Sequence, residues 1–265
     1  MAVQSWQNMA LAQKSDEHVY ELFHENSKIG RLSDAPSALE VRERMAELQE
    51  SLEFTGYPLV ELPRKWAKMK LSLASAILTR TSVRHFSPCR LTLREVSTLL
   101  HYAYGITRHN QGTDFPRPFR VVPSGGALYP LEIFLHSPGI QNHPAGLYHY
   151  NPTKHCLRHI RQGDETKTLS QLVVFPDLVI GSSLVIFLTA VFERSTFKYG
   201  DRGYRFVLLE TGHVAQNLNV VSNGLGLGSV NIGGFYDREI DEFLGLDGIT
   251  HSTIYIISIG KPGKS

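Results

Sequence analysis

The sequence has little cysteine and no long apolar run. Its two cysteines, Cys89 and Cys156, show no CxxC spacing, so neither a disulfide framework nor a zinc site is indicated, and we expect reduced thiols. No apolar stretch reaches the length of about 18 residues that a membrane span needs, and no secretory segment follows Met1. These absences predict a cytoplasmic protein that does not enter a membrane.

An excess of one charge is also missing. The chain has 27 Lys and Arg against 25 Asp and Glu, a formal net charge of +2, and its basic residues are scattered. Such a balance does not predict a nucleic-acid surface, and any anion it binds should be small. With 42% apolar residues in 265 positions, the chain can bury a large core.

Two parts are predicted. Residues 1–70 are more polar and form a helical N-terminal arm or accessory region, and the prolines of 56–66 predict a connector. One apolar helix face in the arm is marked by positions at i, i+3 and i+7: Met45, Leu48 and Leu52. The main domain covers residues 71–265.

Strand and helix signals are mixed in the main domain. Helices are predicted at 71–79, at 92–104 with a Thr92/Glu95 capping box, and at 204–223. Strands are predicted by the apolar run 182–192, by the closing run "STIYIISIG", and by a hairpin with the turn "NPTK". The elements follow no regular βαβ repeat, so the fold class is α+β.

A group of ionisable residues follows the apolar run 182–192 in "KYGDRGYR". Asp201 could cap the helix that we expect to begin at Tyr204, and Arg202 and Arg205 could pair with acids such as Glu210. That structural interpretation leaves Lys198 and Tyr199, an amine and a phenol beside an apolar wall, as candidates for proton transfer.

Three other stretches could bind a ligand. Arg80, Ser82 and Arg84 alternate, which in an extended segment puts two guanidinium groups and a hydroxyl on one face, suited to a phosphate; a solvated basic strand is the alternative. In "PSGGALYP", Gly125 and Gly126 allow close approach of backbone to a ligand and Ser124 adds a hydroxyl, although a plain turn explains the glycines equally well.

The third stretch is "GLGLGSVNIGGF". Its five glycines lack the GxGxxG pattern, which argues against a dinucleotide-binding Rossmann loop. The amides near Gly233 and Gly234 could face a flat ring, whereas helix termination, with Gly224 ending the preceding helix, and a turn are the structural alternative.

Two Glu and His pairs raise the alternative of a metal site. Glu21 with His24, and Glu210 with His213, have the Glu-x-x-His spacing of di-iron bundles. Because the sequence is rich in strands, we expect no metal, and we expect Glu210 and His213 to be packed polar groups of a helix. The histidines of the hairpin are expected at the surface: His143, His149, His155 and His159.

Seven strings together resemble one family. In order they are "HENSK", "RTSVRHF", "PSGGALYPLEIF", "GLYHYNP", "FKYGDRGYRFVLLETGHVAQNL", "GLGLGSVNIGGFYD" and "SIGKP", and they are similar to the SagB-type azoline dehydrogenases of the nitroreductase superfamily. The resemblance extends from about residue 75 to the end, with a weaker match at 20–30. It implies a nitroreductase-like fold, a central mixed sheet flanked by helices, and a homodimer with FMN at each subunit interface.

The resemblance also implies roles for residues at that interface. Arg80 and Ser82 would hold the FMN phosphate and ribityl end, Arg84 would lie near the N1/O2 edge of the ring, and Lys261 is a further phosphate ligand. The backbone of Ile232, Gly233 and Gly234 would lie near flavin N5. The partner subunit would contribute a further stretch, namely Ser124, Gly125, Gly126 and Leu128.

Lys198 and Tyr199 match the catalytic pair of that family. The implied reaction oxidises a thiazoline or oxazoline on a peptide or carrier protein to the thiazole or oxazole, with O2 reoxidising the flavin, and the implied partner is a cyclodehydratase or assembly-line enzyme. Phe197 stands where many relatives have Trp, and Ala127 and Tyr129 replace the Asn and Gln of simple nitroreductases. The alternatives are a general FMN and NAD(P)H oxidoreductase acting on a small molecule, and a non-catalytic scaffold.

Overall fold

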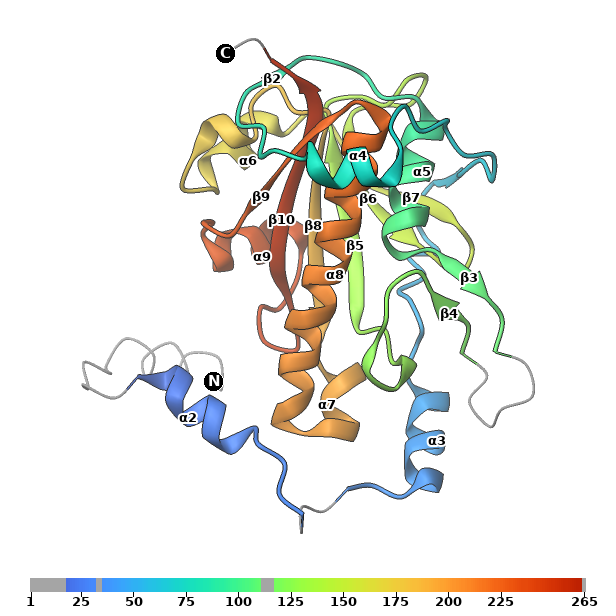
Figure 1. The fold of residues 1–265 in the computed structure, drawn as a ribbon, viewed down its shortest axis with the longest axis vertical. Coiled ribbons are helices and arrows are strands. Elements are labelled where there is room, and N and C mark those ends of the chain that lie inside the picture. The colour runs from blue at the N-terminus through green and yellow to red at the C-terminus, as the bar shows by residue number, and fades with distance from the viewer. Residues whose placement is uncertain (1–17, 32–34, 111–116, 264–265) are drawn as a thin grey trace.

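The computed structural model describes residues 18–31, 35–110 and 117–263 (Figure 1). Residues 1–17 of the predicted arm and 264–265 of the predicted main domain lie outside the described residues. In the described part, no helix combines the length and apolar character that crossing a membrane requires.

A sheet of eight strands forms the centre. Its spatial order is β1-β7-β6-β5-β8-β10-β2, with β9 also paired to β10. The strand pairs found among the described residues are antiparallel, so the prediction of a mixed sheet was wrong; the parallel contact is an isolated bridge between Ser82 and Ser229. The strands are β1 (Leu59–Glu61), β2 (Phe86–Ser87), β5 (Leu131–Ser137), β6 (Gly146–Asn151), β7 (Cys156–Gln162), β8 (Leu184–Val191), β9 (Gly228–Ile232) and β10 (His251–Pro262).

Helices cover both faces of this sheet. α5 (Leu93–Tyr104) and α8 (Asp201–Leu225) pack on one face, where Leu99 and Val214 join a large apolar cluster. α6 (Thr166–Gln171) and α9 (Asp237–Leu244) pack on the other face through Leu169 and Ile240. Because β5 and β8 are buried on both sides, they are largely apolar along their length. The predicted α+β class is confirmed.

Local signals explain where several elements begin and end. The Thr92/Glu95 capping box starts α5 as predicted, and Ser72 caps α4 (Leu73–Leu78), which crosses α8 near its C-terminus (Figure 1). The hairpin β6–β7 turns at "NPTK" as predicted. α8 is longer than predicted: it begins at Asp201, so Asp201 is not its cap, and the left-handed residue that ends it is Gly226 (φ 76°), two residues beyond Gly224.

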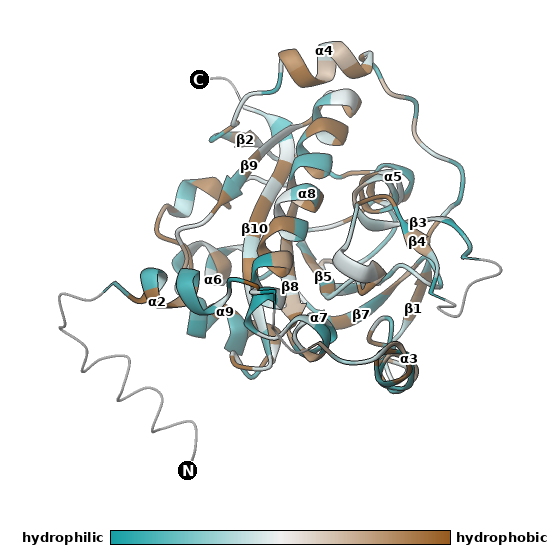
Figure 2. Cartoon of the chain, turned by 60° about the horizontal axis from the view of Figure 1, so that its bottom comes forward, coloured by the Kyte–Doolittle hydropathy of each residue, from teal (hydrophilic) through white to brown (hydrophobic). Residues whose placement is uncertain are grey.

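The described part of the arm contains two helices, α2 (Val19–Asn26) and α3 (Ala38–Glu47). In α3 the buried residues are Val41 and Met45. The predicted face was correct only at Met45, because Leu48 ends the helix and Leu52 lies beyond it. α3 lies beside α7 (Glu193–Tyr199), at the end of the molecule that Figure 2 brings forward.

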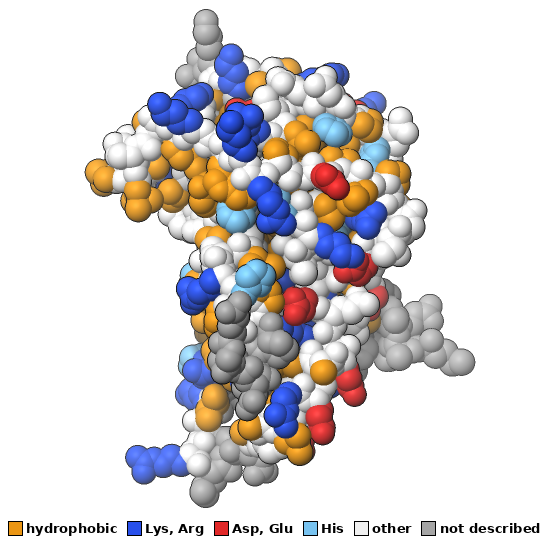
Figure 3. Space-filling view, turned by 90° about the vertical axis from the view of Figure 1, so that its right-hand side faces the viewer, with side chains coloured by type: hydrophobic (Ala, Val, Ile, Leu, Met, Phe, Trp, Pro, Cys, Tyr) orange, Lys and Arg blue, Asp and Glu red, His pale blue; other side chains and the backbone are white. Residues whose placement is uncertain are grey.

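A second, two-stranded sheet consists of β3 (Ile106–Arg108) and β4 (Phe119–Arg120) and lies on the right-hand side of the molecule in Figure 1. On the face that carries it, Lys, Arg and His side chains are interspersed with apolar ones (Figure 3).

Candidate functional site

Lys198 and Tyr199 lie at the end of a short helix. The sequence placed them at the end of the apolar strand, but β8 ends at Val191 and α7 follows, so that prediction was wrong. Gly200, with φ 53° and ψ −142°, then reverses the chain into α8. The pair therefore occupies a tight junction between two helices.

The glycine turn of residues 124–127 meets this pair in the same chain. Gly126 has φ +65°, and a Cβ placed on it would lie 2.7 Å from the Tyr199 hydroxyl oxygen and 3.1 Å from Lys198 Nζ. A Cβ on Gly125 would lie 3.0 Å from the Phe206 ring. Two stretches that the sequence analysis singled out separately are thus in contact, and the glycines are needed for close approach as well as for the turn.

Apolar and aromatic groups surround the pair. The Tyr199 ring packs edge-to-face on Phe206, with the ring centroids 4.8 Å apart, and Lys198 Nζ lies 5.2 Å from the Tyr199 ring centroid. Leu128 is buried beside Tyr199. The same cluster contains Val41, Met45 and Phe197, so helix α3 supplies part of this wall, a contact that the sequence does not predict.

The other charged residues of "KYGDRGYR" bind the arm. Arg202 Nη1 donates to the carbonyl of Ser27 at 3.2 Å, and Arg205 Nε donates to the Ser27 hydroxyl at 2.8 Å. The Tyr204 ring packs edge-to-face on Phe23. The predicted pairing of these arginines with Glu210 was wrong, because Glu210 points into the protein, where its carboxylate accepts from Tyr104.

A buried charge network of Glu132, His149 and Arg194 anchors helix α7 to the central sheet. Glu132 Oε1 forms an ion pair with Arg194 at 2.6 Å and Glu132 Oε2 contacts His149 Nε2 at 2.7 Å. The amide of Leu52 also donates to Glu132, at 2.9 Å. Burial opposes ionisation of Glu132, but Arg194 and His149 outweigh it and hold its pKa at about 2. This network ties α7 to strand β5 and to the arm.

Two hairpin histidines belong to the interior. His149 and His155 are buried, so the prediction of surface positions was wrong for both. Each has found polar partners in the core: His149 has Glu132, and His155 lies 2.9 Å from Ser97 Oγ and 3.0 Å from the Tyr150 hydroxyl. Burial, with the charge of Arg64, lowers the pKa of His155 to about 4, which keeps it neutral.

The described residues contain no group of three or more His, Cys, Asp or Glu side chains arranged to hold a metal ion. Glu210 is buried as predicted, whereas His213 of the same helix is exposed and does not share its surroundings.

The predicted phosphate ligands gather at the other end of the molecule. Ser82 bridges to Ser229 at the start of β9, and Lys261 lies opposite Ser87 near the end of β10. Within the part of the chain that the structure describes, Arg80, Arg84 and Lys261 form no ion pair with an acid. No described acid therefore competes with a bound anion for these three charges.

The predicted ring contacts follow along β9. Ile232 is the last residue of the strand, and the exposed Gly233 and Gly234 come directly after it. At about 3.3 Å per residue, Ser229 and Gly233 lie about 13 Å apart. The edge of β9 thus carries cations at one end and accessible amides at the other.

Within one chain, the Lys198–Tyr199 pair with its glycine turn lies far from the predicted phosphate ligands. Phe206, near the start of α8, contacts Gly125, while Asn223, near its end, donates to the carbonyl of Ala76 and to Thr79 on the way to Arg80. At 1.5 Å per residue these two positions of α8 are about 25 Å apart. Lys198 and Tyr199 are accordingly remote from the phosphate ligands of their own chain.

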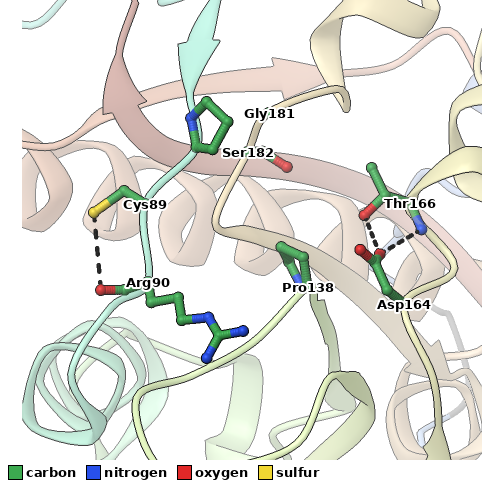
Figure 4. A pocket seen from close by; sticks show the side chains of 8 residues that line it. Cys89, Arg90, Pro138, Asp164, Thr166, Gly181 and Ser182 are labelled. Atoms are coloured by element: carbon green, nitrogen blue, oxygen red, sulfur yellow. Dashed lines mark hydrogen bonds between the residues drawn. The ribbon is translucent and has the colours of Figure 1, made fainter.

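Two pockets lie away from Lys198 and Tyr199. One of about 400 Å³ is lined by Cys89, Arg90, Pro138, Asp164 and Ser182, among others (Figure 4). Another of about 200 Å³ lies beside β3, lined in part by charged and imidazole side chains, namely Arg64, Arg108, His101, His109 and His155. None of the predicted site residues lines either of these two pockets, whereas Leu128 lines a third one together with Arg117, Arg120 and Tyr129.

Comparisons with curated proteins give two informative relatives. A Methanocaldococcus jannaschii protein named as a nitroreductase is 38% identical over 175 residues, 66% of this chain and 85% of its own length. The microcin B17-processing protein McbC of Escherichia coli is 31% identical over 176 residues, 64% of this chain and 62% of its own.

Solved structures share the fold. An Anabaena variabilis protein described as a nitroreductase is 26% identical with a TM-score of 0.71; the match covers 95% of this chain but only 48% of that protein, about half its length. A chain of the E. coli microcin synthetase McbBCD complex with truncated pro-MccB17 has a TM-score of 0.59 at 24% identity over 93% of this chain and 92% of its own.

A Desulfovibrio desulfuricans protein in complex with FMN has a TM-score of 0.51 at 17% identity, over 74% of this chain and 88% of its own. The model of the nitroreductase family matches residues 77–261, the greater part of the chain. The family match and the shared fold together show that this chain belongs to the nitroreductase family.

Proposed function

We propose that the chain is an FMN-dependent dehydrogenase that oxidises thiazoline or oxazoline rings, carried by a peptide or a carrier protein, to thiazoles or oxazoles. The observation that carries this proposal is the contact of Lys198 and Tyr199 with the glycine turn at Gly126. Similarity to a microcin-processing protein supports a substrate of peptide origin.

The residues fit FMN. Arg80, Ser82 and Lys261 would hold the phosphate and ribityl end: the cations Arg80 and Lys261 have no acidic partner in the described structure, and Ser82 offers a hydroxyl. Arg84 would face the N1/O2 edge of the ring. The backbone after β9 would meet the ring itself, through Ile232, Gly233 and Gly234.

Two copies of the chain would build each site. The glycine turn, with Ser124, Gly125, Gly126 and Leu128, lies too far along α8 from Arg80 for one flavin to touch both within one chain. We therefore propose a homodimer in which the turn and the catalytic pair of one copy complete the cofactor site of the other. Exposed apolar residues on two adjoining helices would be covered in such a dimer: Leu73, Ile77 and Leu78 of α4, and Leu208 and Leu209 of α8.

Proton transfer would belong to Lys198 and Tyr199. The α-carbon of the azoline is acidified by the adjacent C=N and carbonyl groups, and its proton would pass to the Tyr199 hydroxyl oxygen as phenolate or to Lys198 Nζ as neutral amine. The other member of the pair would hold this base in its reactive form and offset developing charge, a role that can contribute about 10² to 10⁴ in rate. FMN, when bound, would accept the hydride that leaves the ring methylene carbon, and O2 would then take up the two electrons.

Residues 1–70 would act as an accessory region beside the site, because α3 packs against Leu128 and Tyr199. A cyclodehydratase or an assembly-line enzyme in the cytoplasm is the proposed partner. The fold shared with a chain of the microcin synthetase complex supports this assignment.

The test is a visible spectrum of the purified protein, followed by mass spectrometry of a thiazoline peptide incubated with it in air. The proposal expects a yellow protein and O2-dependent loss of two hydrogen atoms from the peptide. A yellow protein that leaves the peptide unchanged but consumes NADPH with nitroaromatics or quinones would instead support the general oxidoreductase, which the archaeal relative favours. A colourless protein that binds a cyclodehydratase would support a scaffold.

A further inference from the structure

A buried carboxyl group lies directly beneath the glycine turn. Glu210 is only 3% exposed and sits one helical turn after Phe206 on α8. Phe206 faces Gly125, and the Ser124 side chain lies close enough to the Glu210 carboxylate to act on its pKa. The same helix face thus supports two consecutive residues of the turn that meets Lys198 and Tyr199.

Glu210 is held in a closed polar network. The Tyr104 hydroxyl donates to Glu210 Oε1 at 2.8 Å and accepts from the Leu131 amide at 3.2 Å. The Tyr129 amide donates to Ser124 Oγ at 2.9 Å. The guanidinium of Arg120 stacks on the rings of Tyr104 and Tyr129, with its Cζ 4.3 and 5.0 Å from their centroids. The network fixes where the Ser124 hydroxyl can point.

The hydroxyl of Ser124 has one hydrogen and two lone pairs, and the Tyr129 amide occupies one lone pair. When Glu210 is ionised it can only accept, so the Ser124 hydrogen turns inward and a lone pair is left facing outward. When Glu210 is protonated it can donate to Ser124, and the Ser124 hydrogen is then free to point outward. Since Ser124 is only partly buried, that outward position is accessible to a ligand.

We propose that Glu210 is a positioning residue of the candidate site: through Ser124 it decides whether the glycine turn offers a hydrogen-bond donor or only an acceptor to the bound flavin. The inference rests on the proposed function for the identity of that ligand. It rests on the network above for the coupling between Glu210 and Ser124.

Both states of Glu210 are accessible near neutral pH. Burial raises the pKa of Glu210 to about 7, although the Ser124 side chain, the hydrogen bond from Tyr104 and the charge of Arg120 act in the opposite direction. The titratable and charged groups that face it are Tyr104 from α5, Arg120 from β4 and Tyr129 after the turn. Burial also raises the pKa of both tyrosines, so Glu210 is the member of this group that titrates near neutral pH.

The test measures FMN dissociation constants by fluorescence at pH 5.5 and pH 8.5 for the wild type, Glu210→Gln, Ser124→Ala and the double variant. Glutamine keeps the shape, accepts from Tyr104 and donates to Ser124 at both pH values, so it fixes the protonated arrangement. We expect the ratio of the wild-type to the Glu210→Gln constant to change by about fivefold between the two pH values, as for one hydrogen bond, and to stay constant in the Ser124→Ala background. The same pH-dependent change in both backgrounds would overturn the inference, as would no change in either.

A second measurement needs no cofactor. The infrared C=O band of protonated Glu210, assigned by its loss in Glu210→Gln, should titrate near pH 7 and move to higher pH in Ser124→Ala, because the ionised form loses a donor. An unchanged titration in Ser124→Ala would contradict the coupling. Azoline oxidation is followed in parallel. If oxidation is absent while the coupling is present, the proposed function fails and the role of Glu210 stands. If oxidation is present while the coupling is absent, the role of Glu210 fails and the proposed function stands.

Discussion

Replacing Gly126 by alanine would bring a methyl group to 2.7 Å from the Tyr199 hydroxyl oxygen and 3.1 Å from Lys198 Nζ. Both distances are shorter than a van der Waals contact, so the two side chains must move. Misplacement of a reacting group by about 1 Å can cost about 10²-fold in rate, and we expect a loss of that order in azoline oxidation.

Backbone strain alone does not explain such a loss. Gly126 has φ 65° and ψ 18°, and alanine in this left-handed conformation costs about 1 kcal/mol. Gly245 has nearly the same conformation, φ 75° and ψ 30°, and a Cβ placed there meets nothing within 4 Å. Gly245→Ala is therefore a matched control with the same backbone cost and no contact with the pair.

The assay compares melting temperature, flavin absorbance and the rate of thiazoline oxidation in the two variants. Both should melt about 2–4 °C below the wild type, and both should remain yellow, while only Gly126→Ala loses activity. Equal activity of the two variants would refute the placement of Lys198 and Tyr199 against the turn.

Three further predictions concern the two buried networks, around Glu210 and around Glu132, and the arm. Because the folded pKa of Glu210 is raised to about 7 from 4.5, the wild type should lose up to ~3 kcal/mol of unfolding free energy as pH rises between these values, and Glu210→Gln should lack this part in urea titrations at pH 5 and 8. The pKa of Glu132 is lowered to about 2, so its contribution is present above its unfolded pKa and lost as pH falls through about 2; Arg194→Ala should cost about 3–5 kcal/mol at pH 7 and flatten that acid limb, and an unchanged limb would contradict the ion pair. Ser27→Ala removes the acceptor of Arg205 and should cost about 1–3 kcal/mol and speed proteolysis within residues 18–31; an unchanged cleavage rate would contradict docking of the arm on α8.

Local signals in the sequence were sufficient for part of the fold. The Thr92/Glu95 capping box and the hairpin turn before Cys156 are encoded within a few residues, and the structure confirms both. The start of α8 was predicted wrongly because Asp is a residue type that commonly caps helices, whereas in the structure Asp201 is already helical and Gly200 takes the positive φ that reverses the chain. Gly203 then allows α7 and α8 to touch, since a Cβ there would lie 2.9 Å from the Ser195 carbonyl oxygen.

Long-range pairing was beyond the sequence. Glu132, His149 and Arg194 come from different elements, and only the antiparallel sheet brings them together. Without an alignment, a histidine on a hairpin gives no sign that a buried carboxylate lies opposite, which is why His149 was expected at the surface. The contact between Gly126 and Tyr199 likewise depends on the tertiary fold, although each stretch could be recognised as unusual by itself.

The role of Lys198 and Tyr199 is tested by comparing the wild type with the Lys198→Ala/Tyr199→Phe double variant by mass spectrometry of a thiazoline peptide in air, with flavin absorbance recorded for both. We expect both proteins to bind FMN and to be yellow, and only the wild type to remove two hydrogen atoms from the ring. Full oxidation of the peptide by the yellow double variant would contradict the assignment of proton transfer to this pair.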